Sequence, residues 1–205
     1  MKIEDKNMEL QILEAAEKLF LEQGYVKTST AQIAKLAGCN QALVHYYYRT
    51  KDNLFEKIFE EKISMIATNI LHIGVSGSTI EERVTQVIGF YFDFLKQNPQ
   101  LAQFVLHEIS SNPARLQSSV ERLRQHVGPI FLQVEAELKK EIKKGTIRPI
   151  SGINLLITII SLNVTPFLVK PILQRALNLG EKEFDTMLEE RKKEVIETVL
   201  SRLRV

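Results

Sequence analysis

Apolar residues recur at intervals of three and four through almost the whole chain, and this spacing constrains the fold more than any other feature. Such a period places apolar side chains on one face of an α-helix, whereas a half-buried strand alternates with a period of two. The first such segment is followed by Gly24, and glycine commonly ends helices. No segment favours a strand convincingly. The sequence therefore predicts an all-α protein of about nine helices.

Capping residues and prolines mark where these helices begin. Thr30, Asn40 and Thr50 can each accept a hydrogen bond from a backbone N–H group of the following turn. Proline after Asn98 and Asn112 suits the first position of a helix, where its missing N–H has little effect. We predict helices over residues 8–23, 30–37, 41–48 and 51–74, and helices that begin after Thr79, Asn98, Asn112, Ser151 and Gly180, with an interruption or kink at Gly128-Pro129.

The composition favours an ordered protein of the cytoplasm. Apolar residues make up 44% of the chain and charged residues 25%, with only 9 Gly and 6 Pro, which is typical of a helix-rich globular protein. A single cysteine excludes a disulfide within the chain and provides no thiol cluster for zinc. No apolar stretch precedes Met8, so no secretory signal is predicted there.

One segment, residues 153–173, is almost long and apolar enough to span a bilayer. Polar residues recur along it at steps of three and four, and two prolines, Pro166 and Pro171, fall in its last third. A narrow polar stripe on an apolar helix is typical of a helix buried against protein. We therefore expect this segment to pack inside a soluble protein, with a membrane-associated helix as the alternative.

Charge is unevenly distributed near the N-terminus. The whole chain carries a formal net charge of +2, whereas Val26 to Lys57 contains five basic residues against two acidic ones. The same region holds two short predicted helices joined at Gly38 and Cys39, which is the arrangement of a helix-turn-helix. A basic helix-turn-helix indicates DNA binding.

The stretch from Ile12 to Phe55 resembles the DNA-binding region of the TetR family of bacterial transcriptional regulators. The matching residues follow the family's order and spacing: Ile12, Ala15-Ala16, Leu19-Phe20, Gly24-Tyr25, Thr28-Ser29, Ile33-Ala34, Ala37-Gly38, Tyr47-Tyr48, Lys51 and Leu54-Phe55. Beyond this stretch only the number and order of helices match. The resemblance implies a helix-turn-helix domain over residues 1–50 and a helical ligand-sensing and dimerisation domain over residues 51–205.

The resemblance also implies how such a protein works. A homodimer forms through the last two long helices, over residues 151–170 and 184–203, and binds a palindromic operator with half-sites roughly 34–36 Å apart. A small, largely apolar ligand tilts the helix after Thr50 and weakens DNA binding by a coupling of about 1–3 kcal/mol. Release of the repressor then permits transcription, and activation instead of repression is left open.

The helix from Gln41 is expected to enter the major groove, because the second helix of a helix-turn-helix does so. Gln41 can pair with adenine through two hydrogen bonds, and Ala42 and Leu43 can touch a thymine methyl group, which predicts a preference for A·T pairs. Free N–H groups at Thr30 and the ammonium of Lys51 suit phosphates.

The resemblance also implies that His45, Tyr46 and Tyr47 contact phosphates and that Tyr48 points into the core. The alternative is that Tyr46 to Tyr48 only close a small core, but three successive helical residues span about 300° and cannot all point inward. The predicted DNA-contact set is Thr28, Ser29, Thr30, Gln41, Ala42, Leu43, His45, Tyr46, Tyr47 and Lys51.

The C-terminal part is rich in phenylalanine and the chain contains no tryptophan, which suits either a packed core or an apolar cavity. By resemblance, a ligand pocket lies among the middle helices, near Phe94, Phe104, His107, Phe131 and Asn163. Two alternatives stay open: a regulator that binds DNA constitutively with a solid body, and a helical ligand-binding protein without affinity for DNA.

No pattern predicts an enzyme, a cofactor or a metal site. None of the 4 histidines follows a glutamate by three residues, and phosphate-loop and zinc spacings are absent. His107 and Glu108 would point about 100° apart on a helix, which disfavours an acid–base pair. Cys39 is expected to fill space as a small apolar residue instead of acting as a redox switch.

Overall fold

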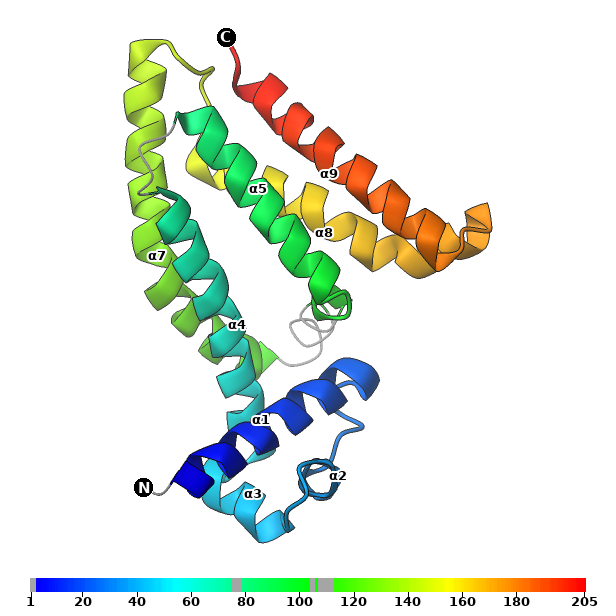
Figure 1. The fold of residues 1–205 in the computed structure, drawn as a ribbon. Helices are drawn as coiled ribbons and strands as arrows, with labels where there is room; N and C mark the ends of the chain where they lie inside the picture. The colour runs from blue at the N-terminus through cyan, green and yellow to red at the C-terminus, as the bar shows by residue number, and fades with distance from the viewer. Residues whose placement is uncertain (1–2, 75–78, 104–105, 107–112) are drawn as a thin grey trace. The chain divides into compact units, whose positions relative to one another are not determined.

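The computed structural model describes residues 3–74, 79–103, 106 and 113–205, and every regular element in these ranges is a helix (Figure 1). The helices are α1 (Ile3–Gln23), α2 (Thr30–Leu36), α3 (Gln41–Tyr48), α4 (Lys51–Gly74), α5 (Ile80–Gln97), α7 (Pro113–Lys144), α8 (Gly152–Leu177) and α9 (Glu181–Leu203). Residues 101–103 add a helical turn after α5. The described residues contain no strand, so the predicted all-α class is confirmed.

The residue that caps α3 is the one predicted from the sequence, whereas the residue that caps α2 is not. Asn40 caps α3 as predicted, because its Oδ1 accepts a hydrogen bond from the Leu43 N–H at 2.9 Å. The cap of α2 is Ser29 instead of Thr30. The Ser29 hydroxyl accepts from the Gln32 N–H, and the Gln32 side chain accepts from the Ser29 N–H in return. Thr30 is therefore the first residue of α2, and its hydroxyl can serve another contact.

The chain divides into two compact units. Unit 1 contains residues 1–64 and 104–123, and unit 2 contains residues 65–103 and 124–205. The helices α4 and α7 each contribute residues to both units.

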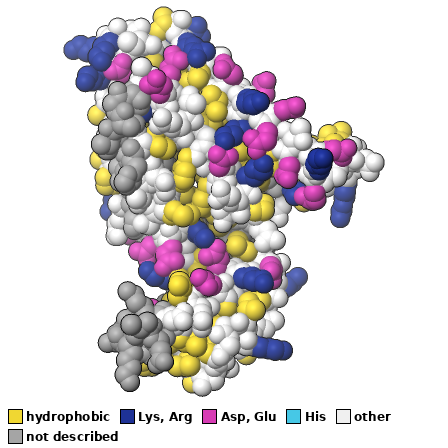
Figure 2. Space-filling view, viewed as in Figure 1, with side chains coloured by type: hydrophobic (Ala, Val, Ile, Leu, Met, Phe, Trp, Pro, Cys, Tyr) yellow, Lys and Arg dark blue, Asp and Glu magenta, His cyan; other side chains and the backbone are white. Residues whose placement is uncertain are grey.

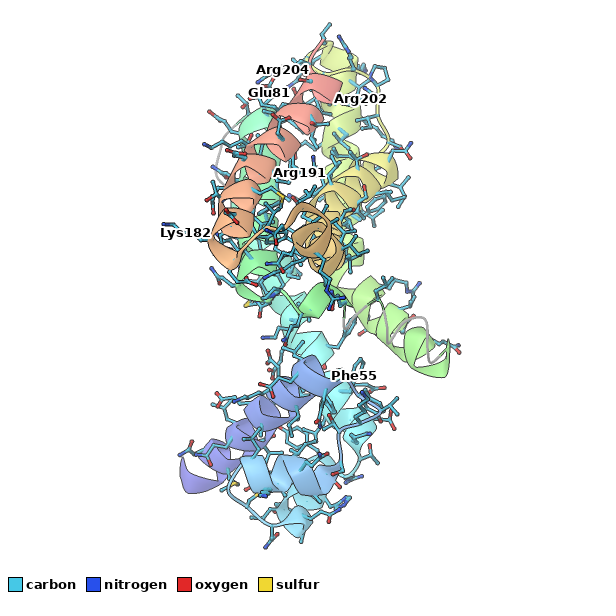
Figure 3. All side chains as sticks on the ribbon, turned by 90° about the vertical axis from the view of Figure 1, so that its right-hand side faces the viewer. Phe55, Glu81, Lys182, Arg191, Arg202 and Arg204 are labelled. Atoms are coloured by element: carbon cyan, nitrogen blue, oxygen red, sulfur yellow. The ribbon has the colours of Figure 1, made fainter. Side chains whose placement is uncertain are left out.

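Aromatic rings fill the core of unit 1. Phe20, Tyr25 and Phe55 are buried, and their ring centroids lie 5.4, 5.6 and 6.2 Å apart. Phe55, labelled in Figure 3, comes from the first turns of α4 and meets Tyr25 edge-on. Buried aliphatic residues from α1 to α4 complete this core: Ile12, Ala15, Ala16, Ile33, Ala34, Val44 and Leu54. The packing fixes which face of α3 points outward.

The centre of unit 2 is formed by α5, α8 and α9. Figure 1 shows α5 and α9 side by side and running in opposite directions, with α8 packed against both. One buried cluster contains Val84, Ile88, Leu138, Ile147, Leu155, Ile159, Val195, Val199, Leu200 and Leu203. A second contains Phe92, Leu95, Ala102, Phe167, Phe184 and Leu188. The buried apolar residues of α9 thus lie in the core of unit 2.

Ion pairs join α5 to α9 at the surface of this unit. The Lys192 ammonium donates to both carboxylate oxygens of Asp93, at 2.6 and 2.7 Å. Arg204 pairs with Glu81 at 3.0 Å, and Figure 3 labels both residues at the same end of the unit. Figure 2 shows further acidic and basic side chains interspersed along α9. The outward side of α9 is therefore strongly polar.

The helix α8 has two apolar faces and a polar stripe. Among the described helices it alone is long and apolar enough to cross a membrane by length and composition, with a mean hydropathy of 1.8. The polar stripe is satisfied locally, because the hydroxyls of Thr158 and Thr165 donate to the carbonyls of Asn154 and Ser161 one turn earlier. One apolar face packs into the two clusters of unit 2. The other exposes Ile153, Ile157 and Ile160, whereas Ile172 and Leu177 are exposed at other angles near the end of the helix.

Candidate nucleic-acid interface

The helix α3 presents one face to solvent because its other face is anchored in unit 1. Val44 is 2% exposed and Tyr48 is 7% exposed, so the opposite side of the helix, with Ala42 and Tyr46, points outward. The exposed positions of α3 are Gln41, Ala42, His45 and Tyr46, and the half-buried ones are Leu43 and Tyr47. Each predicted contact residue of α3 therefore reaches the surface at least in part.

The three consecutive tyrosines have three different environments. Tyr46 is 77% exposed, and Tyr47 is half-buried with its ring edge-on to Tyr46 at 5.1 Å. The Tyr48 hydroxyl donates to the Glu9 carbonyl oxygen at 3.1 Å. Burial, aided by the negative charges of Glu9 and Glu61, raises the pKa of Tyr48 above its ordinary value. The inward position expected for Tyr48 agrees with this geometry.

A chain of hydrogen bonds crosses the exposed surface from α2 to the end of α3. Gln41 Nε2 lies 2.8 Å from Thr30 Oγ1 and 3.4 Å from His45 Nε2. The other ring nitrogen of that histidine, Nδ1, lies 3.0 Å from the carbonyl oxygen of Arg49. The Gln41 side chain, which is the one best suited to contact bases, is therefore fixed by both Thr30 and His45.

Arg49 occupies a strained turn between α3 and α4. Its φ of 61° and ψ of −52° are unusual for a residue with a side chain, and the Thr50 N–H donates to the Tyr48 carbonyl across it at 2.6 Å. This is a γ-turn with positive φ, a conformation that costs about 1–3 kcal/mol. The turn aims the Arg49 carbonyl at the His45 ring. Arg49 is also an exposed cation, which sequence reasoning did not select as a site residue.

Thr28 lies inside unit 1. It is 2% exposed, and its hydroxyl donates to the Gly24 carbonyl at 2.9 Å while accepting from Gln23 Nε2 at 3.1 Å. These bonds fix the loop between α1 and α2. The hydroxyl of Ser29 is likewise used as the cap of α2, whereas Thr30 faces Gln41.

Lys51 is tied to the same loop. Its ammonium donates to the carbonyl oxygens of Tyr25 and Thr28 at 2.9 and 2.8 Å and lies 4.0 Å from the centroid of the Tyr25 ring. Such an arrangement joins a charge-assisted hydrogen bond to a cation–π contact. The side chain predicted to meet phosphate is therefore directed into its own unit.

Two family models match this chain. Residues 12–58 match one described as bacterial regulatory proteins, tetR family, and residues 81–199 match one described as a tetracyclin repressor-like C-terminal domain. The second match alone covers more than half of the chain. This chain belongs to the TetR family. It is a DNA-binding transcriptional regulator and not an enzyme.

Several relatives of this TetR-family protein share moderate identity with it. The nucleoid occlusion factor SlmA of Marinomonas sp. (strain MWYL1) is 26% identical over 175 residues, covering 79% of this chain and 86% of the relative. A fatty acid metabolism regulator protein of Bacillus subtilis (strain 168) is 24% identical over 138 residues, covering 66% and 71%. The structure of the regulator FadR from Bacillus subtilis, in complex with stearoyl-CoA, matches with a TM-score of 0.72 at 19% identity, covering 94% of this chain and 98% of that one. At this identity the structural match shows a shared fold.

The residues predicted to line a ligand pocket in this TetR-family regulator have different surroundings. Phe94 is buried and stacks on Phe90 at 6.4 Å. Phe131 lies beside Gly152 at the start of α8. Asn163 lies 11 residues further along α8, which is roughly 16 Å. The remaining two, Phe104 and His107, lie outside the described residues.

Asn163 is the most unusual polar residue of unit 2. Its side chain is 0% exposed, and neither its Oδ1 nor its Nδ2 has a hydrogen-bond partner among the described residues. Burying an amide without a partner costs about 1–3 kcal/mol. Asn163 lies on α8 between Ile159 of the first cluster and Phe167 of the second. An unpaired amide in this place can recognise a polar group that enters the core.

Two further features bear on the chemistry of this chain: the possible metal ligands of the described residues and the thiol of Cys39. In the described ranges, no three His, Cys, Asp or Glu side chains are grouped so as to hold a metal ion. Cys39 is half-buried in the turn before α3, and burial raises the pKa of its thiol. A raised pKa disfavours the reactive thiolate, in agreement with the expected role as a space-filling residue.

Proposed function

We propose that this regulator is a repressor that a small, largely apolar ligand releases from a palindromic operator. The observation that carries the proposal is the exposed face of α3, where Gln41, Ala42 and His45 stand together. The match of residues 81–199 to a tetracyclin repressor-like domain supports repression and ligand sensing. We assign DNA binding to residues 1–50, and sensing and dimerisation to residues 51–205.

Base contacts come from the start of α3 and phosphate contacts from its surroundings. Exposure supports the following DNA-contact set: Ser29 and Thr30 at the start of α2, Gln41, Ala42, Leu43, His45, Tyr46 and Tyr47 on α3, and Arg49 after it. We assign Thr28 and Lys51 to the framework that holds this surface, because their polar atoms bond within unit 1.

The experiment that tests DNA recognition is fluorescence anisotropy with duplexes from upstream of the regulator's own gene, at two salt concentrations. We expect binding that weakens as salt rises, because phosphate contacts release counterions. Gln41→Ala should lose about 1 kcal/mol or more of discrimination between the upstream duplex and a scrambled one, because at least one hydrogen bond to a base is lost. The matched control is Gln11→Ala, which removes an exposed glutamine from α1. Equal affinity of the unaltered protein for both duplexes would contradict the proposal.

The ligand is proposed to enter unit 2 near Asn163. The buried, unpaired amide of Asn163 supports this location, because a polar group of the ligand would satisfy it. The solved relative from Bacillus subtilis holds stearoyl-CoA, and an acyl chain has the apolar character expected of the ligand. We therefore propose a long-chain acyl thioester as the first candidate.

The candidate ligand is tested by displacement of the upstream duplex. Stearoyl-CoA should release the DNA, and coenzyme A alone, which lacks the acyl chain, should not. The coupling expected for such a switch is about 1–3 kcal/mol, or roughly 5- to 150-fold in DNA affinity. Identical effects of the two compounds would overturn the acyl thioester as the ligand.

We propose a homodimer formed through α8, with α9 at the rim. The exposed isoleucines Ile153, Ile157 and Ile160 support an apolar interface, because they lie together on one face of α8. The charged outward side of α9 is suited to the polar rim that surrounds interface cores. A two-fold dimer then accounts for a palindromic operator.

A regulator that binds DNA without any ligand is the second candidate. The packed clusters of buried apolar residues in unit 2 favour it, because a solid core leaves little room for a ligand. Failure of apolar ligands to displace DNA, together with intact sequence-specific binding, would support this candidate. For either function we propose a cytoplasmic location, where operator DNA is accessible.

A further inference from the structure

Both hydrogens of the Gln41 amide point to protein acceptors. Gln41 Nε2 lies 2.8 Å from Thr30 Oγ1 on α2 and 3.4 Å from His45 Nε2 one turn along α3. A primary amide nitrogen carries two hydrogens, so these two contacts use its whole donor capacity. The carbonyl oxygen Oε1 is left as the part of the amide that can face a base.

The orientation of this amide follows from the turn at Arg49. The Arg49 carbonyl can only accept a hydrogen bond, so His45 Nδ1, at 3.0 Å from it, must carry a proton. In a neutral imidazole the other nitrogen, Nε2, then has a lone pair and needs a donor. Gln41 meets this need with its Nε2, whereas a flipped amide would bring its oxygen against the lone pair.

We propose that His45 is a specificity-determining residue that fixes Gln41 as a hydrogen-bond acceptor in the major groove. The proposal rests on the proposed function, in which Gln41 contacts a base. His45 acts here as a positioning residue, through the amide it holds. The strained backbone of Arg49, with its φ of 61°, holds the carbonyl that sets the tautomer of the ring.

An acceptor reads a different set of bases from a complete glutamine amide. Adenine N6 and cytosine N4 are donors in the major groove, whereas guanine and thymine offer only acceptors and a methyl group. Wild-type protein should therefore accept adenine or cytosine at the contacted base with similar affinity and reject guanine and thymine. The double contact to adenine predicted from the sequence needs Gln41 Nε2 to donate to N7, which breaks its bond to Thr30 or His45.

The test measures affinity for four duplexes that differ only at the base where Gln41→Ala loses discrimination. Wild type should bind the adenine and cytosine duplexes within about 3-fold of each other, below the discrimination of a bidentate pair. His45→Ala frees one amide hydrogen and should raise the preference for adenine over cytosine by about 5-fold or more. Thr30→Val, which removes the other acceptor with little change of shape, should shift the preference in the same direction.

The Gln41→Ala variant shows whether His45 acts by orienting Gln41 or by contacting the base itself. In Gln41→Ala protein, adding His45→Ala should leave the ratio of adenine to cytosine affinity unchanged. A change of the same size in this background would mean that His45 reads the base itself, and would overturn the proposal. An unchanged ratio in the single His45→Ala variant would overturn it as well.

A second measurement does not depend on DNA. In neutral imidazole, ¹⁵N NMR distinguishes a protonated from an unprotonated ring nitrogen, and the His45 signals are those missing from His45→Ala. We expect Nδ1 to be protonated and Nε2 to be unprotonated, and the reverse would overturn the proposal. If wild type binds all duplexes equally, the proposed function fails and this proposal with it. Specific binding without the predicted base preference overturns only the present proposal.

Discussion

The ammonium of Lys51 joins the first turn of α4 to the loop before α2. It donates to two part-buried carbonyls, of Tyr25 and Thr28, and covers the Tyr25 ring. Lys51→Met keeps the length of the side chain and removes the charge. Hydrogen bonds to a charged group contribute about 1.5–3 kcal/mol, so we expect the free energy of unfolding to fall by about 2 kcal/mol.

Urea unfolding followed by tyrosine fluorescence measures this loss, because 4 of the 5 tyrosines belong to unit 1. The matched control is Lys57→Met. Lys57 is exposed and pairs with Glu61 at 3.5 Å, and such surface pairs contribute about 0–1 kcal/mol. If both variants lose the same small amount, the Lys51 bonds do not stabilise the loop.

Individual side chains also show where sequence reasoning about the site reaches its limit. The outward position of Tyr46 follows from helical periodicity once Val44 and Tyr48 are taken as inward, whereas Gln41 shares their side of the helix and is exposed at its first residue. The roles of Thr28 and Ser29 cannot be predicted in this way. The sequence offers two adjacent hydroxyl residues with the same chemistry, and only the geometry of the loop buries Thr28 and makes Ser29 the cap of α2. The turn at Arg49 leaves no signal in the sequence, since its positive φ occurs in a residue that normally avoids it.

The sequence predicted where helices begin and end better than it predicted which elements they pack against. Caps and glycines placed α3 and α4, and the starts of α8 and α9, to within a residue or so of the observed positions. The first helix begins at Ile3 instead of Met8, because nothing before Met8 stops a helix even though the apolar pattern begins there. An apolar stripe does not reveal what covers it, and the apolar residues of α9, expected at a dimer interface, pack into their own unit.

Two glycines in unit 2 give opposite predictions for the same substitution. A Cβ at Gly89, in the middle of α5, would meet only the Lys192 Cε at 3.6 Å, an ordinary contact. Because glycine weakens a helix interior relative to alanine, Gly89→Ala should raise the free energy of unfolding by about 0.5–1 kcal/mol. A Cβ at Gly152 would lie 2.5 Å from Glu135 Oε2, which accepts the Gly152 N–H.

Gly152→Ala should therefore lower stability, because Glu135 must move and lose that bond, at a cost of about 1 kcal/mol or more. Urea unfolding followed by circular dichroism, on both variants and wild type, measures the two changes. Destabilisation by Gly89→Ala would mean that the Lys192 side chain, held by Asp93, cannot accommodate a methyl group.

Across the whole molecule, recognition of the proposed palindromic operator requires a second copy of the chain. The exposed row of Ile153, Ile157 and Ile160 on α8 has Ile157 in its middle, and 57% of that residue is exposed. An exposed residue can be changed without a core defect, so a charge at this position acts on association and not on folding. Binding through two linked half-sites exceeds binding through one by a factor of about 10²–10⁴, which makes DNA affinity sensitive to the dimer.

Ile157→Glu should therefore convert the dimer to monomers in sedimentation velocity and weaken binding to a two-half-site duplex by about 100-fold or more. Affinity for a duplex with one half-site should change little, because α3 and the core of unit 1 are untouched. Val205→Glu adds the same charge at an exposed apolar residue outside the isoleucine row of α8 and should remain dimeric. A dimer that survives Ile157→Glu would move the interface off this face of α8, and the two half-sites would then require another contact between the copies.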